Sequence, residues 1–100
     1  MTIKPRILVA RAIFPDALAK LEESFEVESN QADQVFTADE LRQHLEGVSG
    51  ALVTGSERID QNALANAKSL TIAANISVGY NNFDVPAMTS AGVMATNTPD

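Results

Sequence analysis

The sequence predicts a three-layer α/β fold built on a five-stranded parallel sheet. Two observations predict it: short apolar runs typical of buried strands alternate along the chain with amphipathic segments, and most of those segments begin with a helix-capping residue or proline. Because strand–helix–strand crossovers are right-handed, few arrangements remain, and we expect the flavodoxin-like order 2-1-3-4-5. In that order the first helix lies on one face and the next three on the other. The final helix of such a fold is expected to be missing, since only residues 97–100 follow the fifth predicted strand, too few to make it.

The first half of the chain is predicted to contain two strands and two helices. A buried strand is expected at residues 6–11, and a helix begins at residues 14–16, where Pro15 suits the first turn. Alternating apolar and acidic residues at 25–29 predict a short edge strand. Thr37 and Glu40 have the spacing of a capping box, which begins the second helix.

The second half is predicted to contain three strands and two helices. The strands are expected at residues 50–54, 70–78 and 93–96. The helices are expected at residues 61–67, capped by Asp60, and from Asp84 to Ala91.

The composition excludes several classes of protein. The net charge is −6 and no basic run occurs, which argues against nucleic acid as a partner. The absence of cysteine excludes disulfides and thiolate metal sites and fits a reducing cytoplasm. The N-terminus does not resemble a signal peptide, and no apolar run is long enough for a membrane span. We therefore expect one cytoplasmic domain over residues 1–100, without a membrane segment.

The strongest candidate for a binding site is the segment 75–84, in which a β-rich run ends at Ser77-Val78-Gly79 before an Asn- and Asp-rich turn. The backbone N–H groups of Val78 and Gly79 are suited to hold an anion at the carboxyl end of a strand. An ordinary strand-to-helix turn that needs glycine is the alternative, and the local sequence leaves both open. His44, the only histidine, has no orienting partner nearby in sequence and is expected on a helix surface. No Gly-x-Gly-x-x-Gly or Walker-type loop follows any predicted strand.

Four segments together carry a resemblance to a known family: residues 9–15, 57–60, 75–84 and 91–100. On these residues the chain resembles the N-terminal part of the D-isomer-specific 2-hydroxyacid dehydrogenases, most closely bacterial glyoxylate/hydroxypyruvate reductases or 2-ketogluconate reductases. The resemblance implies that the chain is a substrate-binding domain, cut off before a Rossmann domain that binds NAD(P)H. The intact parent would reduce a small 2-oxo acid to a D-2-hydroxy acid by hydride transfer.

The resemblance also implies the roles of individual residues. The backbone N–H groups of Val78 and Gly79 would hold the substrate carboxylate, Thr54 would border the substrate, and Asn97 would lie near the interdomain cleft. No catalytic, cofactor-binding or metal-binding residue is implied within this chain, so the chain alone is expected to be inactive.

Two further expectations concern partners. With no fifth helix, one face of the third to fifth strands should expose apolar side chains, through which the chain could self-associate. The alternative function is a freestanding or engineered flavodoxin-like half-domain, acting as a scaffold or binding module without catalysis.

Overall fold

The computed structural model describes residues 4–32, 34–76 and 81–97 of the chain. Within these ranges, strands and helices alternate from one end to the other. The strands are β1 (Arg6–Val9), β2 (Glu26–Ser29), β3 (Gly50–Val53), β4 (Ile72–Asn75) and β5 (Met94–Asn97). The helices are α1 (Pro15–Ser24), α2 (Ala38–Leu45), α3 (Gln61–Leu64) and α4 (Val85–Ser90).

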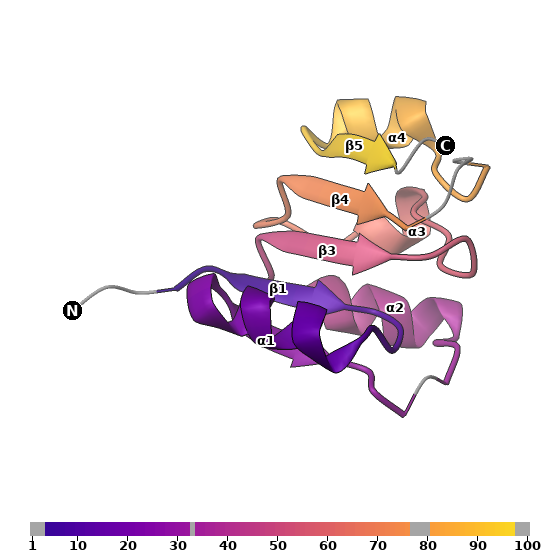
Figure 1. Ribbon diagram of the computed structural model, residues 1–100. Helices are drawn as coiled ribbons and strands as arrows, with labels where there is room; N and C mark the ends of the chain where they lie inside the picture. The colour runs from indigo at the N-terminus through magenta and orange to yellow at the C-terminus, as the bar shows by residue number, and fades with distance from the viewer. Residues whose placement is uncertain (1–3, 33, 77–80, 98–100) are drawn as a thin grey trace.

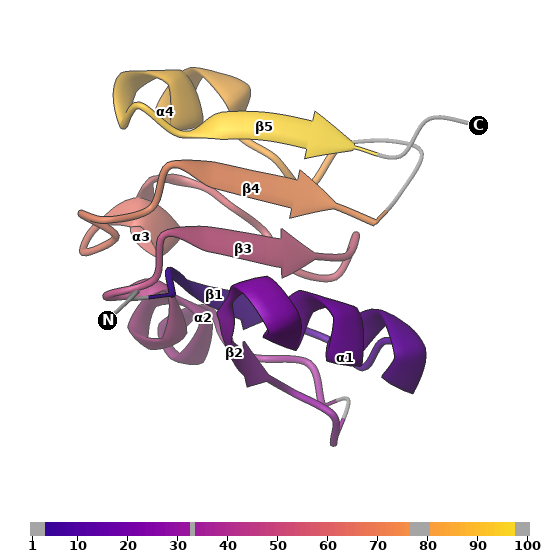
Figure 2. The ribbon, with the colours of Figure 1, turned by 60° about the vertical axis from the view of Figure 1, so that its left-hand side comes forward.

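The strands form one parallel sheet in the order β2-β1-β3-β4-β5, which confirms the predicted topology. Figures 1 and 2 show α1 on one face of the sheet and α2, α3 and α4 on the other, as the right-handed crossovers require. The ends of the central strands are aligned, since Val53 pairs with Asn75 and Asn75 pairs with Asn97. The turns that follow these strands therefore lie along one edge of the sheet.

The predicted helix starts are confirmed. The Thr37 hydroxyl accepts from the Glu40 N–H at 3.1 Å, and the Glu40 carboxylate accepts from the Thr37 N–H at 2.9 Å, forming the capping box. Asp60 and Asp84 cap α3 and α4 by accepting a backbone N–H from the residue three positions on. Each cap fixes the point at which the chain leaves a turn at the carboxyl edge and enters a helix.

Some predicted boundaries are too wide. The helix predicted over residues 61–67 ends at Leu64, because the N–H groups of Ala65 and Ala67 bond to carbonyls only three residues back instead of four. The predicted strand at 6–11 ends at Val9, and the one at 70–78 begins at Ile72. Residues 77 and 78, its predicted end, lie outside the described residues.

The hydrophobic core lies on one side of the sheet, under α2, α3 and α4. These helices contribute Leu41, Leu45, Ala63 and Met88, which are 0–3% exposed. By contrast, α1 on the opposite face has no fully buried residue. The two faces of the sheet are therefore covered unequally.

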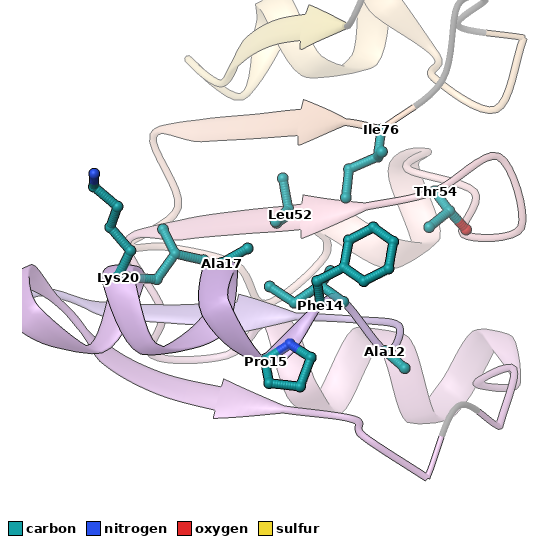
Figure 3. A pocket seen from close by; sticks show the side chains of 10 residues that line it. Ala12, Phe14, Pro15, Ala17, Lys20, Leu52, Thr54 and Ile76 are labelled. Atoms are coloured by element: carbon teal, nitrogen blue, oxygen red, sulfur yellow. The ribbon is translucent and has the colours of Figure 1, made fainter.

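The face that α1 leaves open exposes the predicted apolar patch. Here the side chains of Ile72, Ile76 and Met94 are 39%, 43% and 63% exposed. Beside α1 a depression of about 770 Å³ opens, and Figure 3 shows Phe14, Leu52 and Ile76 around it. A second depression of about 370 Å³ continues over β3 and β4. We call this surface the uncovered face.

No helix within the described ranges is long and apolar enough to cross a membrane.

Candidate functional site

The turns after β1, β3 and β4 start from the carboxyl edge of the sheet, where open α/β proteins bind ligands. Such ligands lie where the strand order reverses, and in this sheet the reversal falls between β1 and β3. Arg11 and Thr54 lie just after these two strands. The carboxyl edge of the sheet is therefore the candidate site. The side chains of its turns form one connected polar network.

The centre of that network is a buried carboxylate, Glu57, in the β3–α3 turn (residues 54–60). Glu57 is 2% exposed. Its Oε1 accepts from the Thr54 N–H at 2.9 Å and from the Thr54 hydroxyl at 3.0 Å. The Thr54 Oγ1 in turn accepts from the Ser56 N–H at 3.2 Å. The turn is thus folded around its own glutamate, and the hydroxyl hydrogen of Thr54 is committed to it.

The second oxygen of Glu57 faces Arg11 at the end of β1. The Arg11 Nη1 lies 4.0 Å from the Glu57 Oε2 and donates to the Ser56 hydroxyl at 3.1 Å. This oxygen is buried and has no hydrogen-bond partner among the described residues. An isolated buried carboxylate is costly, so the neighbouring guanidinium offsets much of that cost. The pair ties the turns after β1 and β3 together.

The chain after β4 is joined to the same turn by Asn82. Its Nδ2 donates to the Glu57 carbonyl at 2.7 Å and to the Thr54 carbonyl at 3.1 Å. Its Oδ1 accepts from the Nδ2 of Asn75, which is 1% exposed, at 2.9 Å. The three turns at the carboxyl edge are therefore linked by side chains as well as by the sheet.

The structure places two of the four predicted site residues on this edge. Thr54 follows β3 and Asn97 ends β5, and both are half-buried. One strand lies between them, so they are about 10 Å apart, given the usual spacing of strands. Val78 and Gly79 lie outside the described residues, between Ile76 and Asn81.

Sequence reasoning did not single out Glu57, and it included Asn75 and Asn82 only as part of the candidate segment 75–84, without a role for either side chain. The partners of Asn82 lie seven to 28 residues away in the chain, so no local pattern connects them. The residues next to Glu57 in the sequence are those of an ordinary solvated turn. Its only signal is that it begins one of the four segments that carry the family resemblance.

His44 lies away from this edge network and contacts the edge strand β2. Its Nδ1 is 2.5 Å from the Glu28 carboxylate, and its ring stacks on Phe36 with centroids 4.4 Å apart. Glu28 and Glu26 also face Arg6, at 3.6 and 3.7 Å. In the described part of the chain, no three histidine or acidic side chains are grouped so as to hold a metal ion.

Residues 7–100 match the model of a protein family described as D-isomer specific 2-hydroxyacid dehydrogenase, catalytic domain. A glyoxylate reductase of Pyrococcus furiosus is 40% identical over 98 residues, which are 98% of this chain and 29% of the relative. A glyoxylate/hydroxypyruvate reductase B of Serratia proteamaculans is 36% identical over 97 residues, covering 97% of this chain and 30% of the relative. The chain therefore spans less than a third of the length of these curated relatives.

Two solved structures of such dehydrogenases and reductases are also similar to this chain. A putative NAD-binding D-isomer specific 2-hydroxyacid dehydrogenase from Polaromonas superposes with a TM-score of 0.92 at 28% identity, covering 97% of this chain and 31% of that one. An NADPH-dependent glyoxylate/hydroxypyruvate reductase from Sinorhizobium meliloti, solved with NADP and malonate, has a TM-score of 0.73 at 34% identity. The coverage is 97% of this chain and 29% of that one.

Proposed function

Because this chain belongs to the D-isomer specific 2-hydroxyacid dehydrogenase family, within its catalytic domain, we propose that it is the substrate-binding domain of a reductase. The parent enzyme would convert a small 2-oxo acid to the D-2-hydroxy acid. The observation that carries this proposal is the 36–40% identity, over nearly the whole chain, to relatives named glyoxylate and glyoxylate/hydroxypyruvate reductases. Glyoxylate and hydroxypyruvate are therefore the first substrates to test, followed by 2-ketogluconate.

Within this proposal the chain holds the carboxylate of the substrate. The backbone N–H groups of Val78 and Gly79 supply the donors, because successive backbone amides in a turn can bind an anion without a charged side chain. Ile76, which lies two positions before Val78, is held against β3, since its N–H donates to the Val53 carbonyl at 2.7 Å. Thr54 and Asn97, at the ends of the two flanking strands, border the substrate on either side.

The cofactor, NADH or NADPH, belongs to a second, Rossmann domain of the parent enzyme. The residues of this chain do not fit a dinucleotide, because no strand is followed by a Gly-x-Gly-x-x-Gly turn. The proton donor is assigned to that second domain as well. This chain would bind and orient the substrate and, when the two domains close, exclude water from it.

A titration of the ¹⁵N-labelled chain with glyoxylate, followed by NMR, tests the assigned site. We expect saturable shift changes at the amides of Val78, Gly79 and Thr54, with a dissociation constant of about 1 mM or weaker because only half of the site is present. Ethylene glycol, which lacks a carboxylate, is the matched control ligand and should produce no saturable change.

Two results of this titration would count against the proposal. Glyoxylate shifts confined to scattered lysine and arginine residues would indicate nonspecific anion binding. No saturable shift at any amide would favour the alternative of a half-domain scaffold without a substrate site.

A further inference from the structure

We propose that a second copy of this chain packs on the uncovered face, sheet against sheet, about a two-fold axis that runs along β4. The observation that carries this proposal is a row of three residues across the face, with a hollow at one end and a protruding methionine at the other. A two-fold axis through the middle of the row places the methionine of each copy over the hollow of the other. The inference concerns a partner and does not rest on the proposed function.

The row consists of the first residues of β3, β4 and β5. Gly50 pairs in register with Ile72, and Ile72 pairs with Met94. Paired residues of neighbouring strands point to the same face, and Ile72 lines the smaller depression, so all three positions lie on the uncovered face. Gly50 has no side chain and lines the same depression, whereas Met94 is 63% exposed. The surface therefore changes from a hollow to a protrusion along the row.

The spacing of the strands brings these two ends together across a two-fold axis. β3 and β5 lie on either side of β4, each at about 4.8 Å, so the axis exchanges β3 of one copy with β5 of the other. Met94 of the second copy then lies over Gly50. Its flexible side chain fills the depression of about 370 Å³, which Leu21 and Phe25 also line. The same contact occurs twice, as an isologous interface requires.

Helix α1 leaves room for the second sheet. It lies at the β1 and β2 side of this face, while β3, β4 and β5 have no helix over them (Figures 1 and 2). Packed sheets lie about 10 Å apart, which is also about the diameter of a helix. The second sheet therefore lies level with α1, and its β5 edge meets the side of α1 that carries Leu21.

The contact surface carries no charge. The side chains that β3, β4 and β5 direct to this face are those of Leu52, Ile72, Ala74, Met94 and Thr96. The net charge of −6 lies outside this surface, so salt screens the repulsion between the two copies. Three short strands and one side of a helix would bury on the order of 1,000 Å² in total, at the small end of specific interfaces. We therefore expect a weak dimer, with a dissociation constant on the order of 10 μM.

Cross-linking tests the position of the axis, because the chain contains no cysteine of its own. Ile72 lies on the axis, so Ile72→Cys chains treated with a short bis-maleimide should link to each other. Met94→Cys chains should link several-fold less, because the two Met94 positions lie on opposite sides of the axis. The matched control is Ala95→Cys on the same strand, since the Ala95 side chain points to the other face of the sheet and should give only background product.

Sedimentation equilibrium tests the contact between Met94 and the hollow. Met94→Ala should raise the dissociation constant of the dimer about tenfold, because the depression then stays unfilled and less apolar surface leaves water. The matched control is Val85→Ala. Val85 is 41% exposed but lies on α4, on the other face of the sheet, so its replacement should leave the dissociation constant unchanged.

Several results would contradict the proposal. A chain that stays monomeric up to about 1 mM forms no such dimer. Equal cross-linking of the Ile72→Cys and Ala95→Cys chains would indicate random collisions, and more product from Met94→Cys than from Ile72→Cys would place the axis elsewhere. A monomer that carries a bound small molecule in native mass spectrometry would show that a ligand, and not a second copy, covers this face.

Discussion

Replacing Glu57 with alanine is expected to lower the free energy of unfolding of the chain by about 3 kcal/mol. The substitution removes the acceptor for both the N–H and the hydroxyl of Thr54, inside a turn where the carboxylate is 2% exposed. It also removes the carboxylate that faces the guanidinium of Arg11, whose side chain is only 20% exposed. Removing one member of such a pair is costly because the other charge stays largely buried.

Urea denaturation, followed by circular dichroism, measures this change. Glu46→Ala is the matched control: Glu46 is exposed, and its replacement should change the free energy of unfolding by no more than about 0.5 kcal/mol. Equal stabilities of the Glu57 and Glu46 variants would mean that the carboxylate does not organise the β3–α3 turn. That result would contradict the claim that a polar network centred on Glu57 holds the turns of the carboxyl edge together.

The second large effect is expected at the uncovered face. The isolated chain should bind a hydrophobic dye and self-associate, because Ile72, Ile76 and Met94 are exposed beside two apolar depressions. The double variant Ile72→Gln/Met94→Gln should reduce dye fluorescence several-fold and shift the chain toward monomer. Its stability should change little, since both side chains are already 39% or more exposed.

Size-exclusion chromatography and dye titration of the same samples test this expectation. Val35→Gln serves as the control, because Val35 is 55% exposed but does not line either depression. It should leave both readings near those of the unaltered chain. A monodisperse unaltered chain that binds no dye would show that the exposed side chains do not form a binding surface.

Most of the fold could be predicted because its signals are local. The alternation of apolar runs and amphipathic segments predicted the parallel sheet, and the right-handedness of the crossovers favoured its order. Thr37, Asp60 and Asp84 marked the starts of three helices. The end of α3 was placed three residues too late, because bonds to carbonyls three residues back replace helical bonds after Leu64 without a glycine or proline to mark the change.

The candidate site could be predicted only in part. The positions of Thr54 and Asn97 at the carboxyl edge follow from the strand ends, whereas Val78 and Gly79 lie outside the described ranges. The roles of all four residues stay predictions. The contacts of Asn82 could not be predicted, because its partners lie in the β3–α3 turn and at the end of β4, and only the folded sheet brings these segments together. Networks of this kind depend on tertiary structure.

In the function that we propose, this chain supplies the substrate-binding part of a 2-oxo acid reductase. It supplies neither the cofactor site nor the proton donor. The decisive test is to follow the absorbance of NADH or NADPH during incubation with glyoxylate, for the chain alone and for the full-length protein that we propose contains it. We expect steady oxidation of the cofactor by the full-length protein and none above the buffer rate by the chain alone. Turnover by the isolated chain, or none by the full-length protein with any 2-oxo acid, would contradict this assignment.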